Sequence, residues 1–129
     1  MEVDIIINDK SSVSEDDIYF TVTALDIFHG IKPFRVGSIV KLVKDFGNKF
    51  DSEAIRVDLR YAGPSGYVAN SVRTVALGTM SSGRLYDKIL DEDFGIVRFI
   101  LGSVVICKLL THDEIEVLRS NPECDINYL

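Results

Sequence analysis

The sequence contains few of the residues from which metal sites are usually built. Its 129 residues include two cysteines, two histidines and no tryptophan. Cys107 and Cys124 lie far apart, and no Cys-x-x-Cys, His-x-His or His-Glu-x-x-His pattern occurs. Such a set does not assemble a convincing zinc site. The acidic run at residues 91–93 is more typical of a solvated turn than of a site for a hard cation. We therefore expect neither a metal nor a cofactor.

Motifs of nucleotide-binding proteins and hydrolases are also missing. The cluster Gly63-Pro64-Ser65-Gly66 lacks the lysine and the following helix of a phosphate-binding loop, and no Gly-x-Ser-x-Gly is present. These absences argue against an enzyme. A weaker alternative is a small hydrolase that uses His29 with Asp51. It requires the two side chains to lie within hydrogen-bonding distance.

No segment is long and apolar enough to span a membrane. The longest apolar run, residues 96–110, contains Arg98, Gly102 and Lys108, so it is too short and too charged to cross a bilayer. The first residues, Met1-Glu2-Val3-Asp4, are acidic, whereas a secretory signal begins with basic residues. We therefore expect a cytoplasmic protein whose two cysteines are free thiols. We expect no contact with a membrane.

Charge is unevenly distributed along the chain. The formal net charge is −6, which argues against indiscriminate nucleic-acid binding. Residues 1–29 contain one lysine and seven acids, and residues 61–129 contain six cations and nine acids. Residues 30–60, with seven cations and four acids, form the net-positive part. This excess is compatible with an anion-binding face, and equally with the solvated faces of two strands.

Residues that favour β-strands dominate the hydrophobic pattern. Strands are predicted at residues 3–7, 18–25, 39–44, 54–59, 67–69, 96–101 and 104–110. A helix is predicted after the capping pair Asn70-Ser71, and residues 84–90 favour a strand. The capping box from Thr111 to Glu114 predicts a helix through Arg119, followed by a loosely held tail. Strands and helices do not alternate, so the predicted fold class is mainly β, a small antiparallel barrel or sandwich with one or two short inserted helices.

One loop carries the clearest functional signal. Residues 45–53 connect two predicted strands, and Gly47-Asn48 is a turn signal because both residue types tolerate positive φ. Phe50 and Asp51 follow, so an aromatic and a carboxylate are adjacent on a loop held by two strands, which is typical of a recognition tip. We expect Asn48 to be structural. A structural role is equally open for Phe50, with its ring folded back on the barrel, and for Asp51, as a turn-stabilising carboxylate.

The same stretch resembles the HIRAN domain family, from about Tyr19 to Leu110. The core of the resemblance is Gly37-x-Ile39-Val40-x-Leu42-Val43-x-Asp45-x-x-Asn48-x-Phe50-Asp51-x-x-Ala54-Ile55-x-Val57, followed by Gly66-Tyr67-Val68. Phe28-His29-Gly30 is similar, more loosely, to an upstream aromatic element of the family. The resemblance implies a six-stranded, OB-like antiparallel β-barrel over residues 18–110. An N-terminal extension (1–17) would precede it, and a C-terminal helix and tail (111–129) would follow.

The resemblance also implies a function, because in fork-remodelling helicases of eukaryotes the domain captures the 3′ end of single-stranded DNA. An aromatic ring would stack on a terminal base, and Asp51 would accept a hydrogen bond from the free 3′-hydroxyl while repelling a phosphate. Cations would hold the adjoining phosphates. The implied DNA-binding residues are Phe28, His29, Lys32, Arg35, Lys49, Phe50, Asp51 and Arg56.

The sequence departs from the family at two of these positions. Phe50 stands where tyrosine is usual, which removes a hydroxyl, and His29 replaces an aromatic residue. The leading hypothesis is a non-enzymatic module that binds the 3′ end of single-stranded DNA in bacterial or phage DNA processing or repair. The alternative is a protein-interaction adaptor that has lost DNA binding and offers an exposed strand edge to a partner protein.

Overall fold

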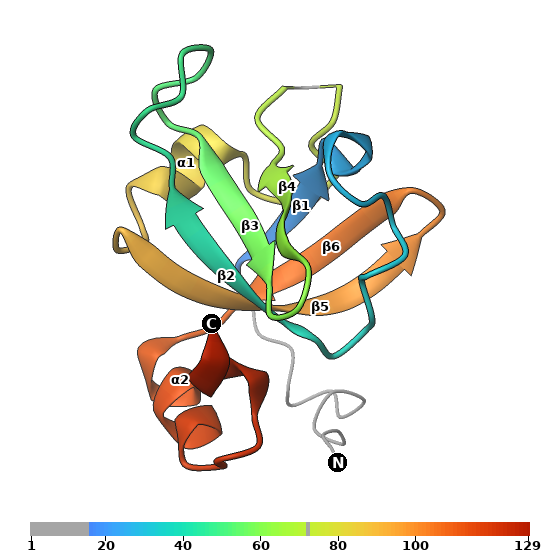
Figure 1. The fold of residues 1–129 in the computed structure, drawn as a ribbon. Helices are drawn as coiled ribbons and strands as arrows, with labels where there is room; N and C mark the ends of the chain where they lie inside the picture. The colour runs from blue at the N-terminus through green and yellow to red at the C-terminus, as the bar shows by residue number, and fades with distance from the viewer. Residues whose placement is uncertain (1–15, 72) are drawn as a thin grey trace.

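The chain forms a closed, six-stranded antiparallel β-barrel with short helical segments outside it (Figure 1). The computed structural model describes residues 16–71 and 73–129. The predicted class, mainly β with two short helices, is confirmed. The elements are β1 (Tyr19–Thr23), the 3₁₀ segment η3 (Leu25–Ile27), β2 (Ile39–Lys44), β3 (Ile55–Leu59), β4 (Gly63–Val68), α1 (Ser82–Tyr86), β5 (Glu92–Leu101), β6 (Val104–Leu109), α2 (His112–Arg119) and the 3₁₀ segment η4 (Asp125–Tyr128).

The barrel order is β1-β4-β3-β2-β5-β6, and β6 pairs back onto β1. Three hairpins, β2–β3, β3–β4 and β5–β6, join strands that are neighbours in both sequence and space. The long connection from β1 to β2 instead joins strands that are not neighbours, because two strands lie between them on either side of the closed barrel. Closure leaves no unpaired strand edge among the described strands.

Alternation along the strands fills the barrel interior. In β3 the residues Ile55, Val57 and Leu59 are buried, while the intervening charged residues are partly exposed. Phe20 from β1 and Leu42 from β2 belong to the same buried cluster. Burial of each such side chain stabilises the fold by roughly 1.5–3 kcal/mol. The β2–β3 hairpin is therefore anchored by its inward-facing residues, which leaves its loop free for another role.

A second apolar cluster holds the C-terminal segment against the barrel, below it in Figure 1. Ile126 in η4 is fully buried, and it clusters with Ile39, Phe94, Leu110 and Ile115. The expectation of a loosely held tail is therefore wrong. Pro122 follows α2, and the chain then turns back so that Ile126 packs into this cluster.

The helix predicted after Asn70-Ser71 is absent, and the described residues between 70 and 81 form turns. The side-chain oxygen of Asn70 accepts a hydrogen bond from Gly83 N at 2.9 Å, so it caps the start of α1. Thr79 Oγ1 lies 2.8 Å from Thr21 Oγ1, which pins the segment to β1. Asn70 and Thr79 thus bond to residues distant in the sequence, and Asn70 does not start a helix of its own.

The strand predicted at residues 84–90 is also wrong, because α1 occupies the first part of this segment. Leu85 and Ile89 are both buried. Their spacing of four residues is the period of a helix rather than a strand. The remaining residues of the segment turn toward β5.

Two strands begin earlier than predicted. β4 starts at Gly63 and β5 at Glu92, whereas the sequence predicts these strands only from residues 67 and 96. Pro64 pairs with Asp58 of β3, and Asp93 pairs with Leu42 of β2, so cross-strand pairing outweighs the local turn composition. The strand predicted at residues 3–7 lies outside the described residues.

Candidate functional site

The β2–β3 loop, residues 45–53, is ordered by its own backbone. Asp45 N donates to Ala54 O at 2.9 Å, directly beyond the last strand pair. Inside the loop, Asn48 N donates to Asp45 O at 3.1 Å, and Ala54 N donates to Asp51 O at 3.2 Å. Two consecutive turns therefore shape the loop, which projects from the barrel at the upper left of Figure 1.

The side chain of Asn48 joins the two turns. Its Oδ1 accepts hydrogen bonds from the backbone N–H groups of Phe50 and Asp51, both at 2.9 Å. Its Nδ2 donates to Asp45 Oδ2 at 3.5 Å, and the same oxygen accepts the hydroxyl of Tyr67 in β4 at 2.7 Å. The structural role predicted for Asn48 is confirmed, and it extends from the loop to the barrel wall.

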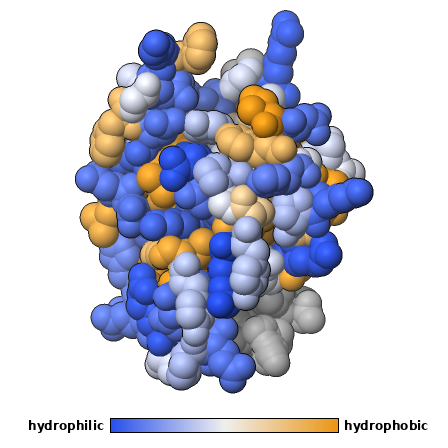
Figure 2. Space-filling view, viewed as in Figure 1, coloured by the Kyte–Doolittle hydropathy of each residue, from blue (hydrophilic) through white to orange (hydrophobic). Residues whose placement is uncertain are grey.

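The loop presents aromatic rings to solvent. Phe50 is 98% exposed, so its ring does not fold back on the barrel. Phe46 is 70% exposed, and Lys49 is exposed between them. Figure 2 shows hydrophobic residues among hydrophilic ones where this loop projects. A phenyl ring in this position offers a flat apolar face to another planar group.

Both carboxylate oxygens of Asp51 have partners. Oδ1 accepts the N–H of Glu53 at 2.9 Å, and Oδ2 accepts the side-chain amide of Asn70 at 3.1 Å. Asn70 is itself held by α1 through Gly83 N. Ser82, which is buried, donates to Glu53 O at 2.7 Å. Asp51 therefore does stabilise the turn. Each of its oxygens can accept a second hydrogen bond, so the carboxylate also keeps capacity for a ligand.

Two other predicted residues, Arg56 of β3 and Phe28 after η3, lie beside Tyr67 of β4. The rings of Phe28 and Tyr67 have centroids 6.0 Å apart, and Tyr67 pairs across the strands with Arg56. Arg56 donates from Nε and Nη2 to the two carboxylate oxygens of Asp58, at 2.8 and 2.9 Å. This hydrogen bonding raises the pKa of Arg56. Burial, followed by the hydrogen bond to Asp45, raises the pKa of Tyr67, so its hydroxyl remains a donor that connects β4 to the loop.

The other predicted residues lie farther from the loop. His29 Nε2 donates to Ala62 O at 2.9 Å, in the turn at the opposite end of β3 from the β2–β3 loop. Arg35 Nη1 donates to Lys32 O at 2.9 Å, and both side chains are exposed. Within the described part of the chain, no hydrogen bond or ion pair joins these three residues to Phe50 or Asp51. The hydrolase hypothesis required His29 to meet Asp51, and both side chains have other partners.

Three residues of this arrangement are absent from the predicted set. Tyr67 and Asp45 connect the loop to β4, and Asn70 connects it to α1. Tyr67 had a signal, because it stands in the Gly66-Tyr67-Val68 element of the family resemblance. Asn70 also carries a signal, but the local pattern around it predicts the start of a helix.

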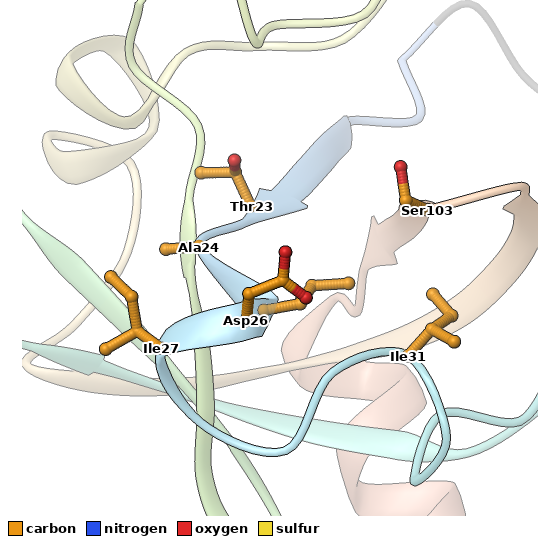
Figure 3. A pocket seen from close by; sticks show the side chains of 7 residues that line it. Thr23, Ala24, Asp26, Ile27, Ile31 and Ser103 are labelled. Atoms are coloured by element: carbon orange, nitrogen blue, oxygen red, sulfur yellow. The ribbon is translucent and has the colours of Figure 1, made fainter.

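A separate cavity of about 280 Å³ lies beside η3. Figure 3 shows the carboxylate of Asp26 and the hydroxyls of Thr23 and Ser103 around it, with Ile27 and Ile31 on either side. None of the eight predicted DNA-binding residues lines it. The cavity is thus lined by no residue of the β2–β3 loop, although Phe28 and His29 lie on the segment between its lining residues Ile27 and Ile31.

Other kinds of site have little support in the described residues. Between residues 16 and 129, leaving out position 72, no three histidine, cysteine or acidic side chains gather as metal ligands. No helix of the same residues has the length and apolar character to cross a bilayer. Cys107 is fully buried, and burial raises the pKa of its thiol, so this cysteine is an inert part of the core.

Comparisons with known proteins bear on the fold. No protein-family model matches the chain, and no curated protein matches it in sequence. A solved structure from Lactobacillus plantarum aligns with a TM-score of 0.50 and 20% identity, over 71% of this chain and 88% of that one. The HIRAN domain of human HLTF aligns with a TM-score of 0.46 and 17% identity, over 83% of this chain and 87% of that one. At 20% identity the first likeness shows the fold, and function has to be argued from the residues.

Proposed function

We propose that this chain is a non-enzymatic module that binds single-stranded DNA and recognises its 3′ end. One observation carries the proposal. Phe50 is 98% exposed next to the oriented carboxylate of Asp51, on a loop that Asn48 holds in shape. The HIRAN resemblance of the same residues supports it.

The two side chains supply complementary contacts. The ring of Phe50 can stack on an unpaired base, a contact worth roughly 1–3 kcal/mol. Asp51 can accept a hydrogen bond from a 3′-hydroxyl, and its negative charge disfavours a phosphate at the same place. A strand that continues past this position carries such a phosphate, so the pair would favour an end over an internal nucleotide.

Cations around the loop would hold the backbone of the DNA. Lys49 is exposed and lies between Phe46 and Phe50. Arg56 would have to share its guanidinium between Asp58 and a phosphate. Lys32 and Arg35 lie beyond Phe28 on the connection from β1 to β2, so they would contact phosphates farther along the strand.

Phe50→Ala is the variant that tests the stacking contact. We expect its affinity for a short single-stranded oligonucleotide to fall about 5- to 150-fold, because one base loses its stacking partner. Fluorescence anisotropy of a labelled oligonucleotide at low salt measures this change. Phe99→Ala is the matched control, since Phe99 is an exposed phenylalanine on β5, away from the loop. Equal affinities of the Phe50→Ala and Phe99→Ala variants would contradict the proposal.

The adaptor hypothesis needs a different surface from the exposed strand edge that the sequence predicts. The barrel is closed, so no free strand edge among the described strands can receive a partner strand. Salt dependence separates nucleic-acid binding from such a role. Phosphate contacts make the logarithm of the affinity fall linearly with the logarithm of the salt concentration.

A further inference from the structure

We infer that Phe46 is a second base-stacking residue, so that the β2–β3 loop takes two consecutive unpaired bases rather than one. The inference rests on the proposed function and extends it. It assigns the base next to the 3′ end to Phe46, and the terminal base to Phe50 beside Asp51.

The position of Phe46 is fixed by the same hydrogen bonds that fix Phe50. Phe46 follows Asp45 in the turn that Asn48 N closes on Asp45 O at 3.1 Å. Asp45 is anchored to the barrel by the hydroxyl of Tyr67 at 2.7 Å. Asn48 Oδ1 holds the backbone of Phe50 at 2.9 Å. Both phenylalanines thus stand on one ordered platform, on either side of Asn48.

The turn itself does not require a phenylalanine at this position. Proline is favoured at the position after the first residue of a common β-turn, and most residue types are compatible with it. Phe46 is 70% exposed and belongs to neither buried cluster of the described residues. Its ring therefore adds little to the core, while it places a large apolar surface in water. Stacking on a base would remove that apolar surface from water.

The chemistry of the two rings defines the ligand. Bases in a duplex are already stacked on both faces, so the rings would receive unpaired nucleotides. A phenyl ring has no hydrogen-bonding group, so it cannot read the edge of a base. Lys49 lies between the two phenylalanines in the sequence and can contact a phosphate, whereas Asp45 and Asp51, which accept hydrogen bonds from the neutral side chains of Tyr67 and Asn70, disfavour a phosphate next to them. We therefore expect binding of single strands with little preference among bases.

The test combines a variant with a change in the oligonucleotide. Anisotropy is measured for the native protein and for Phe46→Ala, with a six-nucleotide strand that either carries all its bases or has an abasic site next to the 3′ end. Removal of either partner should weaken binding by at least about fivefold. Phe46→Ala combined with the abasic strand should weaken binding little more than either change alone, because the ring and the base contribute to the same contact. Phe46→Tyr should keep most of the affinity, and Phe99→Ala should keep all of it.

The outcomes separate this inference from the proposed function. If the native protein binds the strand and Phe50→Ala weakens binding, but Phe46→Ala stays within twofold of native, the second stacking position is wrong and the proposed function stands. If the losses of binding free energy from Phe46→Ala and from the abasic site simply add, Phe46 does not stack on that base and the inference is also wrong. If the native protein binds no single strand at low salt, both proposals fail.

Discussion

At the scale of single residues, Asn48 organises the site. Its one amide group accepts from two backbone N–H groups and donates toward Asp45, so it orients Phe50 and Asp51 together. Asparagine suits this position because its short side chain reaches its own neighbouring backbone. Asn48 therefore controls the positions of Phe50 and Asp51, the two residues proposed to contact DNA, without a DNA contact of its own.

Asn48→Ala should lower the free energy of unfolding by about 1 kcal/mol, because the two loop N–H groups lose their acceptor and exchange it for water. Its affinity for single-stranded DNA should fall as well, since Phe50 and Asp51 lose their common support. Urea unfolding followed by circular dichroism and DNA anisotropy measure the two effects. Asn48→Asp keeps the acceptor oxygen, so it should recover part of the binding. An alanine variant with native DNA affinity would exclude the positioning role.

The sequence alone predicted the local part of this site. Asn48 in a turn follows from short-range rules, and Phe50 and Asp51 follow from their place beside it. The contacts of Tyr67 and Asn70 with the loop could not be predicted, because they join residues 19 or more positions apart. For the same reason, the sequence could not show that His29 donates to the carbonyl of Ala62, 33 positions away.

At the scale of elements, α2 depends on one carboxylate. Glu114 Oε1 accepts the N–H of Thr111 at 2.9 Å, while Glu114 N donates to Thr111 Oγ1 at 3.1 Å, so the predicted capping box is confirmed. The same carboxylate accepts two hydrogen bonds from the nearly buried ammonium of Lys108 in β6, at 2.8 and 2.9 Å. Glu114 therefore both begins the helix and attaches it to the barrel.

This arrangement makes stability depend on pH. Burial acts to raise the pKa of Glu114, but the hydrogen bonds from Lys108 and Thr111 outweigh it, so the pKa lies below its usual value. A carboxylate whose pKa is lowered by folding stabilises the folded state above the unfolded pKa. The stabilisation is lost as the pH falls through the folded pKa. The relevant window is therefore acidic, below the usual range of a glutamate.

Glu114→Gln should lower the free energy of unfolding by roughly 1–3 kcal/mol at pH 7, because Lys108 loses its charged partner. The difference from the native protein should shrink as the pH is lowered through the acidic window, where Glu114 becomes protonated. Urea unfolding at several pH values checks this. Glu116→Gln is the control, since Glu116 is an exposed glutamate on the same helix. A difference that does not change with pH would show that the ion pair is not its cause.

Elements with strong local signals were predicted, and those that depend on distant contacts were not. The hairpins at β2–β3 and β5–β6 and the start of α2 carry turn or capping residues that agree with the fold. Between β4 and β5, Asn70 and Thr79 form hydrogen bonds with α1 and β1, and the described residues of this segment form no helix before α1. The early start of β4 likewise follows from pairing with β3, which the local composition opposes.

At the scale of the whole molecule, the closed barrel displays one polar hairpin loop with two exposed phenylalanines. Closure removes the strand edges through which small β proteins often associate. The net charge of −6 opposes unspecific attraction to DNA. Recognition of a strand end through stacking and a hydroxyl contact fits such a molecule better than broad electrostatic binding.

The most direct test of this account compares two oligonucleotides that differ only in having a 3′-hydroxyl or a 3′-phosphate. We predict that the native protein prefers the hydroxyl by at least about tenfold, because Asp51 accepts its hydrogen bond and repels the phosphate. Asp51→Asn should lose most of that preference, whereas Asp113→Asn, the same change at an exposed acid on α2, should retain it. Equal binding of the two ends by the native protein, or an unchanged preference in Asp51→Asn, would contradict the account.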